Sequence, residues 1–237
     1  IYLAAAIMDP KSLILNNPPS DIAHSRPPYE IPSVYIVGPQ CTGKTTLVEG
    51  LAAHFALHPS PTIPPPTIID EVARHVIRKY QFPPNDIRDA PTKSLELQQH
   101  IQKTQMQVEQ RTRMSGSSWF ISDRSGIDPI VYATMYAPEG GAAQLMESDI
   151  WKFLRGRMVK ALVIMCEPGM DWLDDDGERL MPLDMDEWME MSSHFCLLLE
   201  KSGINYVVLP SRVTGMQERI DFVLDKWKNI KSKRAMI

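Results

Sequence analysis

One segment has a spacing of residues that is suited to binding phosphate. Residues 38–45 read Gly-Pro-Gln-Cys-Thr-Gly-Lys-Thr, a complete match to the pattern G-x-x-x-x-G-K-[ST]. The two glycines allow the backbone to approach an anion closely, and loop amides at a helix N-terminus face phosphates as donors. A lysine in this position reaches the β- and γ-phosphates, and the hydroxyl after it is a ligand for Mg²⁺. The pattern therefore predicts a nucleoside triphosphate site.

The residues on both sides of this segment support the prediction. Residues 34–37 form an apolar run typical of a buried strand, and Leu47, Leu51 and Phe55 recur at helical spacing. A phosphate-binding loop lies between a strand and a helix, so a chance glycine-rich turn is the poorer explanation. The predicted nucleotide-binding residues are Gly38, Pro39, Gln40, Cys41, Thr42, Gly43, Lys44, Thr45 and Thr46.

Acidic residues end two other segments that are predicted as strands. Residues 67–71 end with Asp70 and Glu71, and residues 119–123 end with Asp123. Ligands of open α/β sheets bind at the carboxyl ends of the strands. Asp123 is therefore predicted to hold Mg²⁺ together with Thr45, although a strand-terminal aspartate also commonly caps a helix.

Glu71 is the candidate catalytic base. A carboxylate opposite the γ-phosphate accepts the proton of an attacking hydroxyl. The alternative is a charge at the start of the helix predicted for residues 72–80, and the residues alone do not separate the two. Arg74 shares a helical face with Glu71, so it is predicted to hold this carboxylate or to contact substrate.

The rest of the chain supplies elements that position these residues. Further strands are predicted at 160–166 and 205–209, and helices at 46–58, 93–114, 125–136, 142–158, 189–202 and 216–230. Strands that alternate with helices predict an α/β fold with a five-stranded, mostly parallel sheet in three layers. Residues 1–32 contain six prolines and are predicted to be an extended arm, followed by one domain at 33–237 with a lid at about 171–187.

Four segments together resemble a known family, the P-loop kinase-like ATPases. This family includes the bacterial ribosylnicotinamide kinase domain and the animal protein required for TRP-channel translocation. The segments are GPQCTGKTTL at 38–47, DEVARHVI at 70–77, ISDRSGID at 121–128 and DDGER at 175–179. The similarity extends over roughly residues 33–210.

The resemblance implies roles for several residues. Glu71, Arg74 and Asp128 are expected to face the substrate, Arg124 to lie beside Mg²⁺ and phosphate, and Arg179 to reach the phosphates from the lid. Lys44, Glu71, Arg124 and Arg179 form the expected catalytic set.

The helix predicted at 93–114 is rich in glutamine. In similar nucleoside kinases a helix at this place offers an amide to the substrate base, which makes Gln98 and Gln105 substrate-binding candidates. Most of the other glutamines of the helix are expected at the solvent-exposed surface.

The resemblance leaves two functions open, because the family contains both kinases and nucleotide-binding regulators. The first is an ATP-dependent phosphotransferase that acts on a hydroxyl of a small nucleoside-like molecule, or on a phosphate as nucleotide kinases do. The second is a regulatory or adaptor protein that binds ATP or GTP with little turnover. Residues 123–126 fit the D-x-x-G pattern of GTPases, but no N-K-x-D follows, so a regulatory GTPase is not favoured.

Composition argues against other classes of protein. The net charge is −4, and the basic residues gather only in the C-terminal tail, so nucleic acid is not an expected partner. Three widely separated cysteines suit a reducing compartment, and no apolar run approaches the ~20 residues of a membrane span. We therefore expect a cytoplasmic protein that binds ATP, or GTP, with Mg²⁺ and a small acceptor, its oligomeric state being left open.

Overall fold

The computed structural model describes residues 31–83, 86–169 and 180–235, with side chains as far as Ile230. The strands are β1 (Val34–Val37), β2 (Thr67–Ile69), β3 (Phe120–Asp123), β4 (Leu162–Cys166) and β5 (Tyr206–Leu209). The helices are α1 (Lys44–Leu57), α2 (Val72–Tyr80), α3 (Asp86–Asp89), α4 (Pro91–Met114), α5 (Asp128–Tyr136), α6 (Gly141–Glu147), α7 (Asp149–Met158), α8 (Met185–Lys201) and α9 (Met216–Ala235).

The five strands form one sheet in the order β2-β3-β1-β4-β5. Every neighbouring pair is parallel, and Val34 of β1 is in register with Ile121 on one side and Leu162 on the other. From β1 the chain moves outward to β2 and returns through β3, whereas β4 and β5 extend the sheet on the opposite side of β1. The strand order therefore reverses beside β1, and ligands of such sheets bind at this point.

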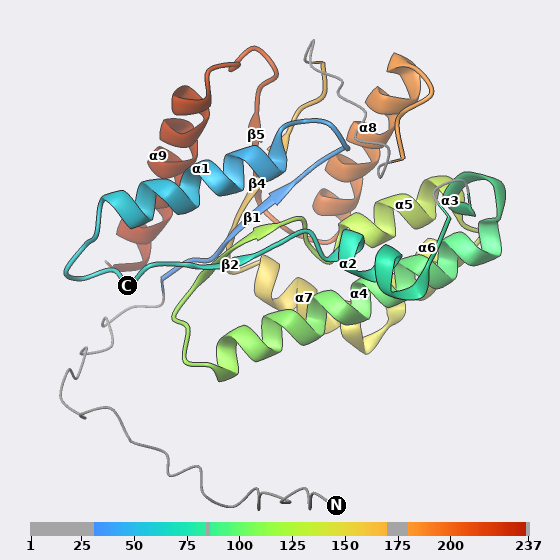
Figure 1. Ribbon diagram of the computed structural model, residues 1–237, viewed down its shortest axis with the longest axis horizontal. Helices are drawn as coiled ribbons and strands as arrows, with labels where there is room; N and C mark the ends of the chain where they lie inside the picture. The colour runs from blue at the N-terminus through green and yellow to red at the C-terminus, as the bar shows by residue number, and fades with distance from the viewer. Residues whose placement is uncertain (1–30, 84–85, 170–179, 236–237) are drawn as a thin grey trace, which may run out of the picture.

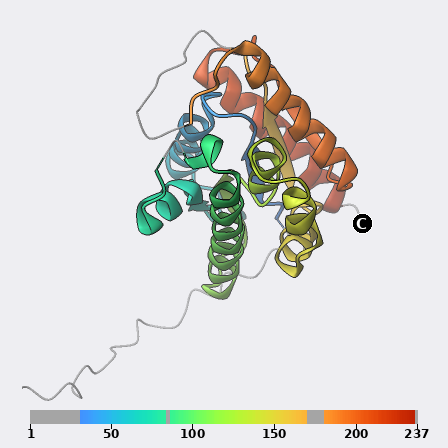
Figure 2. The ribbon, with the colours of Figure 1, turned by 90° about the vertical axis from the view of Figure 1, so that its right-hand side faces the viewer.

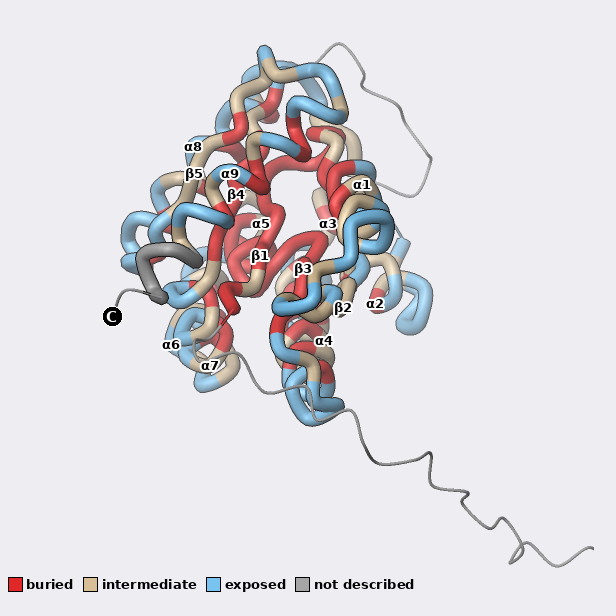
Figure 3. The backbone as a smooth tube through the Cα atoms, turned by 90° about the vertical axis from the view of Figure 1, so that its left-hand side faces the viewer, coloured by how far each residue is buried: buried red, intermediate tan, exposed pale blue. Residues whose placement is uncertain are grey.

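The side chains of β1 alternate between the two faces of the sheet, as the period of a strand requires. Tyr35 and Val37 pack against helices α2 to α8, and Val34 and Ile36 pack against α1 and α9. Figure 1 shows α1 and α9 covering one face of the sheet and α4 and α7 lying on the other. Figure 3 shows that the inner strands β1, β3 and β4 are buried between these layers. The predicted three-layer α/β fold is confirmed.

Several predicted helices have different boundaries in the structure. The single helix predicted at 142–158 is wrong, because Ser148 separates α6 from α7 and its side chain accepts a hydrogen bond from the amide of Trp151. Helix α8 begins at Met185, four residues before the predicted start, because Asp184 caps it by accepting from the amide of Glu187. The start of α8 therefore occupies the end of the predicted lid.

The segment between α2 and α4 is not among the predicted helices. It contains the short helix α3, and α4 then starts at Pro91 rather than at residue 93. Helix α4 lies beside α5 (Figure 2) and also contacts α2 and α7. The glutamine-rich helix is consequently packed against other helices along much of its length.

The ends of the predicted regions lie partly outside the described residues. Of the predicted arm, only Ile31 and Pro32 are described; Ile31 is buried, and the carbonyl of Pro32 accepts a hydrogen bond from the indole of Trp227. Residues 171–179 of the predicted lid are not described. Within the described ranges, none of the helices combines the length and apolarity needed to cross a bilayer.

Candidate nucleotide and acceptor site

The 38–45 loop joins β1 to α1 at the point where the strand order reverses. Gly38 has φ +131°, and a Cβ there would lie 2.6 Å from the carbonyl oxygen of Cys166, so glycine is required for the loop to pass β4. Gly43 has φ +71° and precedes the first residue of α1. The loop therefore leads directly into the N-terminus of α1, where unpaired helix amides favour an anion.

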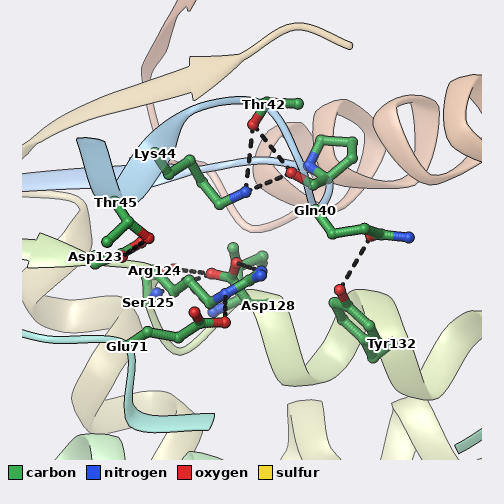
Figure 4. Close-up of polar contacts among 12 residues, drawn as sticks. Gln40, Thr42, Lys44, Thr45, Glu71, Asp123, Arg124, Ser125, Asp128 and Tyr132 are labelled. Carbon is green, nitrogen blue, oxygen red and sulfur yellow. Dashed lines mark hydrogen bonds and ion pairs between the residues drawn. The ribbon is translucent and has the colours of Figure 1, made fainter. Parts of the chain in front are cut away.

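Lys44 is buried within its own loop. Its ammonium donates to the carbonyl of Pro39 and lies 3.3 Å from the hydroxyl of Thr42 (Figure 4). Burial, and then the charge of Arg124, lower the pKa of Lys44 to about 8. A phosphate group placed in the loop would reverse this shift, because its negative charge favours the protonated amine.

Thr45 and Asp123 meet at the adjoining ends of α1 and β3. The hydroxyl of Thr45 donates to Oδ2 of Asp123 at 2.6 Å. Oδ1 of Asp123 is buried and has no hydrogen-bond partner among the described residues, and burial raises the pKa of this carboxyl. A buried carboxylate oxygen of this kind fits a cation. Mg²⁺ is commonly held by one carboxylate and a hydroxyl, with phosphate oxygens and water completing its octahedron, so these two residues fit Mg²⁺.

Glu71 lies between two arginines. Arg124 Nε is 2.6 Å from Oε1, and Arg74 Nε is 2.8 Å from Oε2. Burial alone would raise the pKa of Glu71, but the charge of Arg124 and the hydrogen bond from Arg74 outweigh it and lower the pKa to about 2. Glu71 occupies the N-cap position of α2, although its side chain makes no capping hydrogen bond there.

Asp128 supports the other side of Arg124. Its Oδ1 lies 3.3 Å from Arg124 Nη1, and its Oδ2 accepts from the amide and the hydroxyl of Ser125 at 2.8 and 3.0 Å. Arg124 has φ +74°, and its amide donates to the carbonyl of Ile36. Asp128 therefore holds the turn after β3 and the Arg124 guanidinium in place, as Figure 4 shows.

Two cavities meet at Glu71 and Arg124. The first is lined by the loop residues from Cys41 to Thr46. The second, which we call the acceptor cavity, lies between α2, α4 and α5, and includes Arg74, Gln98, Gln105 and Asp128 in its lining. Glu71 and Arg124 line both cavities. A group bound in one cavity would thus face a group bound in the other across this ion pair.

The comparison with protein families agrees with this geometry. Residues 33–219 match the family model described as an AAA domain. The chain belongs to this family. The resemblance to P-loop kinase-like proteins is thereby confirmed for family and fold, and a P-loop domain of this kind implies nucleotide binding.

Solved structures of NadR protein share the fold of this AAA domain. The complex with NR aligns with a TM-score of 0.62 and 21% identity, over 88% of this chain and 52% of the NadR chain. The complex with NAD and AMP-PNP aligns with a TM-score of 0.52 and 22% identity, over 83% and 49%. The chain thus spans about half the length of these NadR chains. Shikimate kinase from Acinetobacter baumannii in complex with shikimate aligns with a TM-score of 0.49 and 12% identity, over 86% and 95%. No curated protein sequence matches the chain.

The glutamines of α4 in the AAA domain are less exposed than expected. Gln98, Gln102 and Gln105 are all buried, so Gln102 is an exception to the expectation that most of the other glutamines lie at the surface. Gln102 accepts a hydrogen bond from the hydroxyl of Ser148 and faces away from the acceptor cavity. Gln98 and Gln105 line this cavity, and their predicted role in binding substrate remains a prediction.

Arg179 lies outside the described residues, so its expected place over the phosphates remains a prediction. The chain resumes at Leu180, which lines the acceptor cavity. Sδ of Met181 is 3.6 Å from Sγ of Cys41 in the loop. Two described residues of the predicted lid, Leu180 and Met181, therefore lie against the acceptor cavity and the loop of the AAA domain.

Other residues that contact the loop were not anticipated. Tyr132 donates to Oε1 of Gln40, the indole of Trp188 donates to the Gln40 carbonyl, and Arg219 Nη2 donates to the Thr42 carbonyl. Tyr132 lies one helical turn after Asp128, a spacing that could have marked it. Trp188 and Arg219 lie 148 and 177 residues from their partners, and no local pattern marks such contacts.

Proposed function

We propose that this protein transfers the γ-phosphoryl group of ATP to a hydroxyl of a small nucleoside-like molecule. The observation that carries the proposal is that the loop cavity and the acceptor cavity share Glu71 and Arg124. In-line transfer requires a nucleotide and an acceptor on opposite sides of the transferring group. This arrangement supports a kinase more than a protein that only binds a nucleotide.

The loop residues would hold the nucleotide. Lys44 and the loop amides bind the phosphates, and Thr45 and Asp123 hold Mg²⁺, which, when bound, neutralises charge on the phosphate oxygens. Arg124 faces the transferring group from the acceptor side, and Arg179 is proposed to reach it from the lid. These cations stabilise the charge that spreads over the phosphoryl oxygens in the transition state.

Glu71 would receive the hydroxyl of the acceptor. Its two arginine partners keep it ionised and fix its orientation, which a hydrogen-bond acceptor for that hydroxyl requires. Its low pKa makes it a weak base. In a loose transition state for phosphoryl transfer the protein has little covalent chemistry to perform. Glu71 therefore contributes mainly by positioning the hydroxyl. The proton passes to Glu71 as the oxygen–phosphorus bond forms and ADP leaves.

The lining of the acceptor cavity supports a nucleoside-like molecule. Ile77, Ile87, Leu97 and Ile101 supply apolar walls that suit a flat ring. Gln98 is 2% exposed and lines this cavity, and no described residue hydrogen-bonds its amide. An amide that lines a cavity and has no partner in the protein is suited to reading a polar ring edge.

A screen of ATP consumption with nucleosides, nicotinamide riboside, vitamins and nucleoside monophosphates tests this proposal. With an acceptor identified, Glu71→Gln is expected to keep the Mg²⁺·ATP affinity and lose turnover by ~10²–10⁴-fold. Glu96→Gln, an exposed carboxyl on α4, is the control and should retain turnover. Turnover by Glu71→Gln at the wild-type rate would show that Glu71 takes no part in the chemistry. If no acceptor in the panel stimulates ATP consumption, the alternative of a nucleotide-binding regulator replaces the kinase.

A further inference from the structure

A buried carboxyl lies directly behind the acceptor cavity. Glu109 of α4 is 0% exposed and is not part of the cavity lining. Its Oε2 receives two donors, the hydroxyl of Tyr35 at 2.8 Å and Nε of Arg157 at 3.0 Å. Its Oε1 receives Nε2 of Gln105 at 3.1 Å. Glu109 therefore connects strand β1 and helix α7 to a glutamine that lines the cavity.

These contacts decide which end of the Gln105 amide faces the cavity. Nε2 lies 3.1 Å from Glu109 Oε1 and 3.2 Å from the hydroxyl oxygen of Ser122, so both of its hydrogens have acceptors. An ionised carboxyl only accepts, and it would repel the carbonyl end of the amide. The carbonyl oxygen of Gln105 is then the end left for the cavity, and no described residue donates to it.

We infer that Glu109 is a positioning residue, which makes Gln105 present its carbonyl oxygen to the acceptor. The group bound there is then a hydrogen-bond donor, such as a carboxamide or a ring N–H, and not a carboxylate. This inference deepens the proposed function and rests on it for the nature of the acceptor. A ligand carboxylate at the same place would face the Gln105 carbonyl oxygen, and neither acceptor would have a donor. A site built to accept from a donor group discriminates strongly against such a ligand.

The network also predicts the effect of adding a proton. Arg157 from α7 and Tyr35 from β1 are the charged and titratable groups that face Glu109, and both donate to Oε2. A proton on Glu109 therefore lies on Oε1, towards Gln105, and requires the amide to turn over. The cavity then offers an N–H₂ group in place of the carbonyl oxygen.

The variant Glu109→Gln is expected to turn the Gln105 amide over in the same way. It does so without a change of pH, so the charge of the ligand stays the same. Tyr35 and Arg157 both need an acceptor, so the new amide must turn its oxygen to them. Its N–H₂ group then faces Gln105, which has to present its own oxygen in return. The matched control is Gln102→Met, a buried change on the same helix at a residue that contacts Ser148 and lies outside the cavity.

Two probes that differ only at this group test the inference. Nicotinamide riboside and nicotinic acid riboside share ring and sugar and carry a carboxamide or a carboxylate. At pH 8 the wild type is expected to favour the carboxamide in kcat/KM, and Glu109→Gln should lower this preference at least tenfold. Gln102→Met should leave it unchanged. An unchanged preference in Glu109→Gln would overturn the inference.

A second measurement does not depend on turnover. Hydrogen exchange of the Gln105 side-chain amide is followed by NMR in the free protein, with the signal assigned by its loss in Gln105→Met. Both protons should exchange at least tenfold faster in Glu109→Gln, because the N–H₂ group then faces the cavity. Equal rates would overturn the inference. Faster exchange together with no phosphorylation of any acceptor would contradict the proposed function and leave the role of Glu109 standing.

Discussion

At the scale of single residues, the position of Lys44 makes a direct prediction for nucleotide binding. Its ammonium contacts residues of the loop around which a phosphate would bind. Removing it deletes a charge-assisted contact to that phosphate, worth roughly 1.5–3 kcal/mol. Titration calorimetry of Lys44→Ala with Mg²⁺·ATP should show at least tenfold weaker binding. Lys79→Ala, a change on α2 outside both cavities, should bind as the wild type does. Equal affinities for the two variants would contradict the place given to Lys44.

Asp123 predicts a different signature, because its proposed partner is the metal. Asp123→Asn keeps the shape of the side chain and an oxygen for the Thr45 hydroxyl but removes the charge. ATP affinity measured with Mg²⁺ should fall, while ATP affinity measured in EDTA should change little. A loss of the same size in both conditions would mean that Asp123 acts through the fold of the loop and not through the metal.

The burial of Glu109 predicts a pH dependence of stability. Burial raises its pKa from 4.5 to about 7, against the opposing effects of Gln105 and Arg157. The folded protein then binds this proton more tightly than the unfolded chain does. The resulting stabilisation of the folded protein is fully present below about pH 4.5 and is lost as the pH rises through about 7. It amounts to on the order of 3 kcal/mol in total.

Urea unfolding between pH 4 and pH 8 measures this effect. The free energy of unfolding of the wild type, minus that of Glu109→Gln, should fall across this range. Glu147→Gln, a change at an exposed position on α6, is the control and should give a smaller change across this range. A constant difference for Glu109→Gln as well would show that Glu109 has an ordinary pKa.

Residues of the site were predictable where their signal is local. The loop is contiguous, and Asp123 directly ends a strand, so spacing alone placed both. The arrangement around Glu109 was not predictable, because Tyr35 lies 74 residues away and its approach depends on how α4 is rotated against the sheet. The same reason explains why the burial of Gln102 was missed.

At the scale of elements, Ser148 is the residue that divides α6 from α7. Its hydroxyl oxygen lies 3.1 Å from the amide of Trp151, and Ser→Ala at such a cap typically costs ~1 kcal/mol. Chemical unfolding of Ser148→Ala should show a loss of this size. Ser193→Ala, in the interior of α8, removes a hydroxyl that bonds only the preceding turn and should be nearly neutral. Equal effects would mean that Ser148 does not act as a cap.

Capping residues also explain where the helix predictions failed. Hydrophobic spacing continues through residues 142–158, and it hides the interruption that a single serine produces. At α8 the signal was present, because Asp184 is followed three residues later by Glu187, the spacing of a capping pair. Glu187 accepts from the amide of Leu183 and pairs with Arg88 of α3. The acidic composition of the preceding segment masked this helix start.

At the scale of the whole molecule, α9 supports the phosphate-binding loop from behind. Arg219 is 2% exposed, and its Nη2 donates to the Thr42 carbonyl at 2.8 Å. Arg219→Met removes this donor and a positive charge from beneath the loop, so ATP affinity is expected to fall roughly tenfold. Lys226→Met, an exposed change on the same helix, is the control. Unchanged ATP affinity in a folded Arg219→Met protein would show that the loop keeps its shape without this contact.

The architecture was predictable where the alternation of strands and helices along the chain determines it. Apolar strands separated by helices require parallel neighbours and crossover connections, so the sheet and its three layers could be predicted. The position of α9 against both the loop and Pro32 could not be predicted from the sequence. Arg219 and Trp227 resemble ordinary helix residues until their distant partners are known.

The support of the loop by α9 has a consequence for the order of events during translation. The ribosome completes residues 38–45 early and Arg219 and Trp227 among the last of the described chain. A nascent chain that has emerged only as far as β5 therefore contains the whole phosphate-binding loop without the arginine beneath it. Nucleotide added to stalled ribosome complexes should be retained by chains that expose α9, and far less by chains arrested before it. ATP would then stabilise chains that include α9 and offer little help to chains that end before it.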